Sequence, residues 1–314
     1  MRRLTPEAEV LVDSLGAMAE ESIADVGVDA AREQEIGLEP DREPSLGSVR
    51  DATFEGSGGD VPVRVYRPGA GTVGTVVFFH GGGWVTGTLD AAEGFCRSVA
   101  AQAHADVVSV GYRLAPEHRF PAAADDCYDS LTWLEDNGDS VGVDGSRLAV
   151  CGSSSGGNLA ASAALTARDR GGPRLHAQAL VCPALDTRTD RPSHTDPGTG
   201  HFLGTRDMEF FWDCYLGEGR APATDPRAVP MTADDLSGVA PALVVTAECD
   251  ILQSEGSAYA EGLREAGVEV ESSNYTGMFH GFYGFTNDLE DARRCVSHVA
   301  GYLATQLKRQ GSGS

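Results

Sequence analysis

The stretch Leu148-Ala149-Val150-Cys151-Gly152-Ser153-Ser154-Ser155-Gly156-Gly157-Asn158-Leu159 joins a short apolar run to the start of a helical pattern. Three serines stand at this junction, and only Ser154 has a glycine both two residues before and two residues after it. A sharp turn that presses a strand against a helix leaves no room for side chains at those two positions. The pattern therefore predicts a nucleophile elbow with Ser154 at its tip. A serine- and glycine-rich start of an ordinary helix is the alternative, and the flanking strand and helix favour the elbow.

Short apolar runs alternate with helical patterns on both sides of this elbow. The runs cover 75–79, 107–110, 148–151, 179–182, 242–246 and 268–272, and residues 61–66 alternate like a half-buried strand. The helical patterns cover 89–103, 122–135, 156–168, 256–266 and 288–307. Continuous apolar strands that alternate with helices predict an α/β fold with a mostly parallel sheet covered on both faces.

Two segments interrupt this rhythm. Residues 1–47 read as helices with polar breaks, and residues 186–239 are too long for a plain connection between two strands. We expect both to form a cap, with the catalytic α/β domain built from 48–185 and 240–310. Residues 311–314 are expected to be a flexible tail.

Composition excludes several classes of protein. The chain of 314 residues has a net charge of −23, which repels nucleic acid and anionic membrane surfaces. The seven cysteines form no C-x-x-C pair, and several lie in apolar runs, so neither a disulfide framework nor a zinc site is expected. The first residues lack the apolar core of a signal peptide, and no apolar run could span a bilayer. These features predict a cytoplasmic protein.

A second glycine-rich motif, His80-Gly81-Gly82-Gly83-Trp84, follows the strand predicted at 75–79. Backbone N–H groups can bind the oxyanion of an acyl-transfer intermediate best where no Cβ blocks the approach. A plain glycine turn is the alternative, and the position directly after a strand favours an oxyanion loop. His80 precedes Ser154 in the chain, and we expect it to anchor this loop rather than to act as the base.

A nucleophilic serine needs a base, and the base needs an acid that orients it. In a strand–elbow–helix architecture the acid and then the histidine follow the serine. Asp250 comes directly after the run 242–249, whereas Asp186 opens the long interruption and ranks second. His280 lies between glycines in a loop after a strand, while His298 lies within the last helix. We therefore predict Asp250 and His280 as the partners of Ser154.

Weaker patterns carry less weight. Residues 69–74 match G-x-G-x-x-G but precede a strand and open no helix, so a dinucleotide site is not predicted. The aromatic stretch Phe210-Phe211-Trp212 can form either the core of the cap or, together with Trp84, a wall of the substrate pocket.

From about residue 50 onward the chain resembles the hormone-sensitive-lipase-like carboxylesterases of the α/β-hydrolase superfamily, bacterial family IV. The resemblance rests on motifs in the order typical of that family: His80-Gly81-Gly82-Gly83, Tyr112-Arg113-Leu114-Ala115-Pro116-Glu117-His118, Gly152 to Leu159, Asp250-Ile251-Leu252 and His280-Gly281-Phe282. It implies an α/β-hydrolase fold with a helical cap, in which the segment from Tyr112 supports the oxyanion loop.

The resemblance also implies roles. Ser154 would be the nucleophile, His280 the base and Asp250 its orienting acid, and the N–H groups of Gly82, Gly83 and Ser155 would form the oxyanion hole. This chain departs from the family by having Ser153 in place of aspartate or threonine, Ser155 in place of alanine and Ile251 in place of proline. The departures leave the triad intact and leave the oligomeric state, including a homodimer, open.

These residues predict a serine carboxylesterase that acts on small-molecule esters, with short acyl chains preferred by family analogy and with no metal or cofactor. A lactone, amide or carbamate hydrolase with the same triad is one alternative. A ligand-binding protein on the same fold is another, although such a protein would be expected to lose a triad member.

Overall fold

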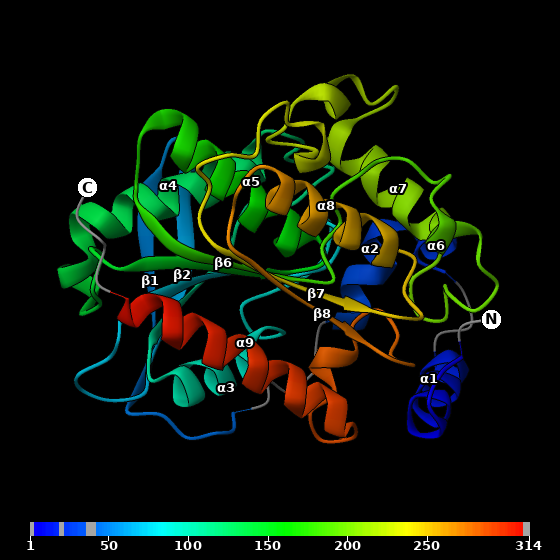
Figure 1. Cartoon of the computed structure of the whole chain (residues 1–314), viewed down its shortest axis with the longest axis horizontal. Coiled ribbons are helices and arrows are strands. Elements are labelled where there is room, and N and C mark those ends of the chain that lie inside the picture. Colours follow the sequence, from blue (N-terminus) through cyan, green and yellow to red (C-terminus); the bar gives the residue numbers. More distant parts are fainter. Residues whose placement is uncertain (1–2, 19–21, 36–41, 310–314) are drawn as a thin grey trace.

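A computed structural model of the chain describes residues 3–18, 22–35 and 42–309. Within these residues, eight strands form one sheet in the order β1-β2-β4-β3-β5-β6-β7-β8 (Figure 1). β2 pairs antiparallel with β1 and β4, and all other neighbours are parallel, as the sequence predicted. The strands are β1 (Ser48–Gly56), β2 (Gly59–Arg67), β3 (Thr75–Phe79), β4 (Asp106–Val110), β5 (Leu148–Ser153), β6 (Leu175–Val181), β7 (Ala242–Ala247) and β8 (Val270–Tyr275).

Strand β1 is an element that the sequence analysis did not predict. It pairs along its whole length with β2, from Ser48 opposite Arg67 to Gly56 opposite Gly59. Most of its side chains are exposed, and Phe54 is the one that is buried. An edge strand that buries so little has no strong apolar pattern, so only its pairing with β2 reveals it.

Helices cover both faces of the sheet, each over its own apolar core. One face carries α3 (Glu93–Ala103) and α9 (Glu290–Lys308), and the other carries α4 (Ala122–Asn137), α5 (Ser155–Arg170) and α8 (Gln253–Glu265) (Figure 1). The five predicted helices are present with shifted ends, and α3 begins four residues after the predicted start at Leu89. No helix in the described ranges is both long and apolar enough to cross a bilayer.

The remaining helices are α1 (Pro6–Met18), α2 (Ile23–Glu35), α6 (Pro192–Thr195) and α7 (Thr205–Leu216). α2, α6 and α7 lie at one end of the molecule (Figure 1), and the Ala24 backbone N–H donates to Asp207 of α7 at 3.3 Å. α1 packs instead through Leu11 and Leu15 against the core beneath the other face of the sheet. α2 therefore contacts α7, whereas α1 contacts the core of the α/β unit.

Parallel strands bring the loops that follow them to one edge of the sheet. β3 lies between β4 and β5, so the chain leaves β3 to one side and returns on the other. Ligands of open α/β sheets bind at such a reversal, outside the carboxyl ends of the strands. The glycine loop follows β3 and Ser154 follows β5, so both motifs reach this position.

Candidate active site

Ser154 occupies the turn between β5 and α5 with φ 54° and ψ −119°. A residue other than glycine is strained in this region, and strain of this kind is found at functional sites. A Cβ on Gly152 would lie 2.0 Å from the carbonyl oxygen of Gly156, and a Cβ on Gly156 would lie 1.9 Å from that of Phe79. Both glycines are therefore sterically required, as the spacing predicted.

Ser154, His280 and Asp250 form one series of hydrogen bonds. His280 Nδ1 lies 2.8 Å from Asp250 Oδ2, and His280 Nε2 lies 3.0 Å from Ser154 Oγ. A carboxylate only accepts, so Nδ1 carries the proton and Nε2 offers a lone pair to the serine hydroxyl. The arrangement can remove the hydroxyl proton when Oγ attacks an electrophile. Both contacts predicted from the order of the motifs are present.

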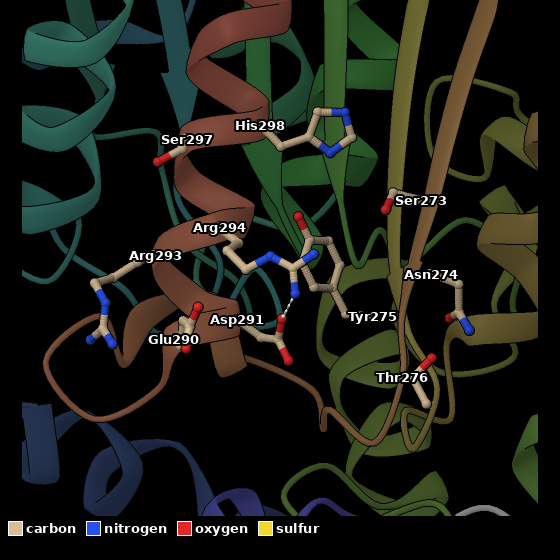
Figure 2. Close-up of a pocket in the computed structure, with 10 residues that line it drawn as sticks. All are labelled: Ser273, Asn274, Tyr275, Thr276, Glu290, Asp291, Arg293, Arg294, Ser297 and His298. Atoms are coloured by element: carbon tan, nitrogen blue, oxygen red, sulfur yellow. Dashed lines mark hydrogen bonds and ion pairs between the residues drawn. The ribbon is translucent and has the colours of Figure 1, made fainter.

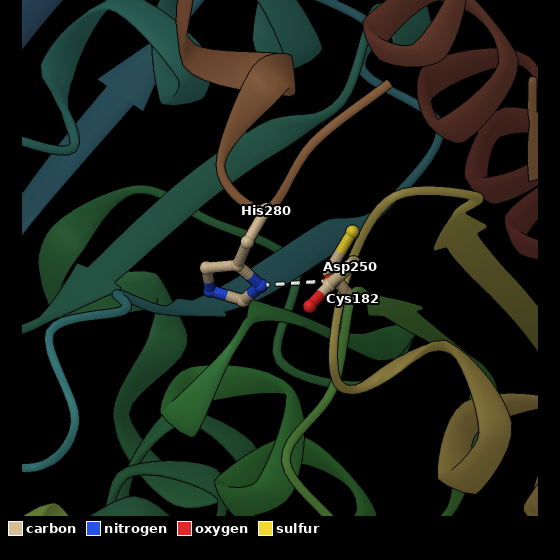
Figure 3. Close-up of side chains that lie close together, drawn as sticks. All are labelled: Cys182, Asp250 and His280. Carbon is tan, nitrogen blue, oxygen red and sulfur yellow. Dashed lines mark hydrogen bonds and ion pairs between the residues drawn. The ribbon is translucent and has the colours of Figure 1, made fainter. Parts of the chain in front are cut away.

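Asp250 is held by its own loop. The residue is 1% exposed, and the Leu252 backbone N–H donates to Oδ1 at 2.9 Å. Figure 3 shows Cys182, the residue after β6, beside the carboxylate on the side away from the imidazole ring. Burial, together with the negative charge of Asp250, raises the pKa of the Cys182 thiol, so the sulfur stays protonated. A protonated thiol beside the carboxylate can donate a weak hydrogen bond to it.

The same three side chains could be considered as metal ligands, because one ligand atom from each of Cys182, Asp250 and His280 lies within 4.8 Å of the others. Cysteine binds metals as the thiolate, which burial and Asp250 both disfavour here. In addition, Asp250 and His280 use the relevant atoms to bind each other. The donor set therefore suits a hydrogen-bonded acid better than a metal.

The two alternatives for acid and base lie elsewhere. Asp186 accepts hydrogen bonds from Arg188 Nε at 2.9 Å and Arg191 Nε at 2.8 Å. Burial acts to raise the pKa of Asp186, but the bonds from the two arginines outweigh it and lower the pKa. His298 on α9 contacts Glu271 at 2.5 Å. Neither residue touches the His280 ring.

The glycine loop after β3 lies against the serine. A Cβ on Gly81 would lie 3.4 Å from Ser154 Cβ, and Gly82 and Gly83 have φ values of 113° and 60°. Within the described residues, the backbone N–H groups of Gly82 and Gly83 have no hydrogen-bond acceptor. The N–H of Ser155 is one of the first four of α5, which have no acceptor inside the helix. These three N–H groups therefore have no protein acceptor within the described part of the chain.

His80 holds the start of the glycine loop through its contacts with Tyr112 and Gly81. The Tyr112 hydroxyl donates to the His80 carbonyl oxygen at 2.8 Å, and the two rings stack with centroids 4.2 Å apart. His80 Nδ1 lies 2.7 Å from the carbonyl oxygen of Gly81. Burial lowers the pKa of His80 to about 4, so the ring is neutral at pH 7. The segment from Tyr112 thus supports the loop, as the resemblance implied.

Aromatic side chains of α7 lie directly on the same loop. A Cβ on Gly83 would fall 2.3 Å from ring atoms of Phe211. Trp84 is fully buried and stacks on Tyr215 with ring centroids 4.5 Å apart, while Trp212 contacts it at 4.3 Å. Phe210 is partly buried and contacts Phe211 at 6.0 Å. The assignment of Trp84, Phe210, Phe211 and Trp212 to a substrate pocket stays a prediction. Trp84 and Trp212 lie in the packed interior.

Two surface hollows lie away from this site. One, of about 690 Å³, is lined by residues of β8 and α9 such as Asn274, Arg294 and His298 (Figure 2). The other, of about 410 Å³, lies beside Arg168. Neither is lined by a residue of the hydrogen-bonded series. The first is lined by two acidic and two basic side chains, Glu290, Asp291, Arg293 and Arg294, and Asp291 pairs with Arg294 at 2.8 Å, so neither charge is in excess to select a ligand.

Sequence reasoning missed two contacts around the site. Cys182 was interpreted only as a buried cysteine, and no local pattern identifies its contact with Asp250. Arg32 of α2, whose Nε donates to the Val85 carbonyl oxygen at 2.9 Å, was placed only within the N-terminal cap. The one available signal was the position of Cys182 at the carboxyl end of a predicted strand, where functional side chains gather in α/β sheets.

The fold and the site together define an α/β hydrolase with a serine, histidine and aspartate at the carboxyl edge of its sheet. Comparison with known proteins agrees. The model of a family described as having the alpha/beta hydrolase fold matches residues 76–284. The carboxylic ester hydrolase LipN of Mycobacterium tuberculosis is 40% identical over 240 residues, which cover 74% of this chain and 64% of LipN.

Two further relatives are matched over a larger share of their own length. An ethyl acetate hydrolase of Pseudomonas putida is 39% identical over 80% of each chain. The solved structure of a hyperthermophilic esterase from Pyrobaculum calidifontis superposes with a TM-score of 0.89 at 38% identity, covering 98% of this chain and 100% of that one. The chain therefore belongs to the hormone-sensitive-lipase-like carboxylesterases of the α/β-hydrolase fold.

Proposed function

We propose that the chain is a serine carboxylesterase that hydrolyses esters of short carboxylic acids with Ser154, His280 and Asp250 as its triad. The observation that carries the proposal is the continuous series of hydrogen bonds from Ser154 Oγ through the His280 ring to Asp250. Its position at a strained strand–helix turn is the second support. All the chemistry of acyl transfer can be assigned to side chains and backbone groups of this chain.

The first half of the reaction acylates the serine. Ser154 Oγ bonds to the ester carbonyl carbon while its proton moves to His280 Nε2, which gives a tetrahedral oxyanion. The ester C–O bond then breaks, and His280 gives its proton to the leaving alkoxide, so that an alcohol departs. Asp250 holds the ring by its Nδ1–H and stabilises the imidazolium that forms between the two steps.

The second half releases the acid. A water molecule gives a proton to His280 Nε2 and attacks the acyl carbon, and the Ser154 Oγ–acyl bond breaks as the proton returns to Oγ. We assign the oxyanion in both halves to the N–H groups of Gly82, Gly83 and Ser155. Their lack of a partner in the described fold supports this assignment, because the donors need no reorganisation to bind developing charge.

We also propose that residues 1–47 and 186–239 form the cap over the catalytic domain of 48–185 and 240–310, and that the cap limits the length of the acyl chain. The close approach of Phe211 to Gly83 supports a short pocket, because an aromatic ring already occupies the space beside the oxyanion loop. The activity named for the Pseudomonas putida relative, ethyl acetate hydrolysis, points to the same range of substrates.

The compartment and the assembly complete the proposal. All seven cysteines are free, and all but Cys214 are buried, which suits a reducing, cytoplasmic environment. β8 is an edge strand of the described sheet and offers unpaired backbone groups, which supports a homodimer through edge pairing. Size-exclusion chromatography with light scattering would show a single monomer mass if the dimer is wrong.

A p-nitrophenyl ester series from acetate to laurate tests the proposed activity, with the wild type measured beside Ser154→Ala. We expect the wild-type rate to peak at short chains and the variant to lose on the order of 10⁶ in kcat, as removal of a triad serine does elsewhere. Ser153→Ala is the matched control, since it changes the neighbouring hydroxyl and should keep most of the activity.

The other outcomes each revise the proposal in a defined way. An inactive wild type would exclude the esterase assignment and direct the triad to lactones, amides or carbamates, or to ligand binding alone. A Ser154→Ala variant with wild-type rates would show that the nucleophile is wrong. A peak at laurate would refute the short pocket and leave the triad standing.

A further inference from the structure

Arg32, on the N-terminal helix α2, reaches across to the loop that carries the oxyanion donors. Its Nε donates to the Val85 carbonyl oxygen at 2.9 Å, and its Nη2 donates to the Ala115 carbonyl oxygen at 2.9 Å. The guanidinium also binds the carboxylate of Glu117 with both Nη atoms, at 2.7 and 2.9 Å. One side chain thus joins three segments that are far apart in the sequence.

The two carbonyl groups that Arg32 holds belong to the support of the glycine loop. The Val85 N–H donates to the Gly82 carbonyl oxygen at 3.0 Å, and the Ala115 N–H donates to the Trp84 carbonyl oxygen at 2.8 Å. Val85 is fully buried, and Ala115 is 1% exposed. The Val85 carbonyl that Arg32 holds shares its peptide with the Thr86 N–H, which also donates to the Gly82 carbonyl oxygen, at 2.9 Å. Arg32 therefore restrains one peptide that fixes the loop directly and a second residue, Ala115, whose own N–H fixes it.

The planarity of the peptide bond transmits this restraint to the N–H group of Gly83. The Gly82 carbonyl and the Gly83 N–H belong to one planar trans peptide, so they point in opposite directions. The N–H groups of Val85 and Thr86 fix the Gly82 carbonyl at 3.0 and 2.9 Å, and this directs the Gly83 N–H the other way. Glycine adds no side chain that would restrain the plane, so the restraint has to come from such contacts.

We infer that Arg32 is a positioning residue for the oxyanion hole, through which the N-terminal helix controls the rate of the acyl-transfer step. The inference rests on the proposed function, since it assigns the Gly82 and Gly83 N–H groups to the oxyanion. The guanidinium fits this role because it is planar and donates to several acceptors at once, whereas an ammonium group is a single point of charge.

The test compares Arg32→Ala and Arg32→Lys with the matched control Arg206→Ala. Arg206 on α7 pairs with Asp25 on α2 at 2.7 Å and is 70% exposed on its side chain, so the control weakens the same helix without touching the loop. The readouts are kcat and KM for p-nitrophenyl butyrate, the fraction of sites that react with a fluorophosphonate, and the rate of that reaction.

We expect Arg32→Ala to lower kcat by about 10- to 100-fold while KM changes by less than about threefold, because a donor displaced by about 1 Å loses that much stabilisation of the transition state. Arg32→Lys should lie between, and millimolar guanidinium should restore part of the Arg32→Ala rate. Arg206→Ala should keep its kcat within about twofold and gain nothing from guanidinium.

Three results would overturn the inference: an unchanged kcat in Arg32→Ala, a change in KM alone, or an equal loss in Arg206→Ala. If Arg32→Ala has few reactive sites, Glu117→Gln is measured instead, and a kcat equal to wild type per reactive site would count against the inference. If the wild type hydrolyses no ester, the proposed function fails separately. The fluorophosphonate rate then decides on Arg32, because its phosphoryl oxygen also needs the oxyanion donors.

Discussion

The carboxyl ends of β6 and β7 make an instructive comparison, because each neighbouring strand leads to a buried aspartate. Asp186 follows β6 and is 6% exposed, and Asp250 follows β7 and is 1% exposed. Asp250 accepts a hydrogen bond from His280, whereas Asp186 accepts hydrogen bonds from Arg188 and Arg191. Two similar carboxylates at one edge of a sheet therefore have different partners.

The chain that follows each aspartate explains the difference. After Asp250 the backbone turns at once into α8, and the Leu252 N–H holds the carboxylate at the sheet edge, where the His280 loop returns from β8. After Asp186 the backbone leaves the sheet and brings two arginines back within five residues. An arginine partner is always charged and neutralises a carboxylate, while a histidine partner can gain and lose a proton. The partner, more than burial, decides which carboxylate can serve catalysis.

Replacing each aspartate by asparagine gives the largest expected contrast. Asp250→Asn should lower kcat by about 10³- to 10⁴-fold, because an amide can donate to Nδ1 and favour the wrong tautomer of His280. Asp186→Asn should keep kcat within about threefold, because Asp186 does not touch the ring. Steady-state hydrolysis of p-nitrophenyl butyrate measures both.

The same two variants can also refute the assignment of Asp250 as the acid. Equal losses of kcat in the two variants, once scaled to the fraction of sites that react with a fluorophosphonate, would mean that the two strand ends act as one unit. A larger loss in Asp186→Asn would reverse the assignment of the acid.

A smaller effect concerns the contribution of Asp186 to the free energy of unfolding. The pKa of Asp186 is lowered in the fold, where the bonds from the arginines outweigh burial, so the unfolded chain binds the proton more tightly. The stabilisation is then complete above the unfolded pKa of about 4 and is lost as pH falls through the folded pKa. We expect Asp186→Asn to cost about 1.5–3 kcal/mol at pH 7.

Urea unfolding of wild type and Asp186→Asn between pH 7 and pH 3 measures this effect. The difference in the free energy of unfolding between wild type and Asp186→Asn should become smaller as the pH falls below about 4. A difference in the free energy of unfolding that stays constant over this pH range would show that the arginine pairs do not stabilise the charged carboxylate.

Much of the site could be predicted from sequence because its residues are fixed by local backbone rules. A Cβ on Gly152 would lie 2.0 Å from the Gly156 carbonyl oxygen across the turn, and a Cβ on Gly156 would lie 1.9 Å from that of Phe79 on the neighbouring strand β3. The elbow needs both glycines, so it leaves their spacing in the sequence. The parallel strands then bring Asp250 and His280 to the same edge. Asp250 could be preferred to Asp186 from sequence because it directly follows an apolar strand run, whereas Asp186 opens the long interruption.

The rest could not be predicted, because it depends on side chains that meet across long distances in the chain. Arg32 and Val85 are separated by 53 positions, and nothing in the pattern of either segment specifies the contact. The contact between Cys182 and Asp250 is of the same kind. The sequence predicted the segment 186–239 as part of the cap but not where its helices begin and end. It forms α6, α7 and two short 3-10 turns, and its proline- and glycine-rich parts have no periodic apolar face that would mark these ends.

The most direct test of the central claim is to locate the reactive serine. The wild type is treated with a fluorophosphonate and digested, and the modified residue is identified by tandem mass spectrometry, with His280→Gln as the control. We expect one adduct per chain, on Ser154 and not on Ser153 or Ser155, and a strongly slowed reaction in the control. An adduct on a neighbouring serine, or equal labelling without His280, would contradict this claim.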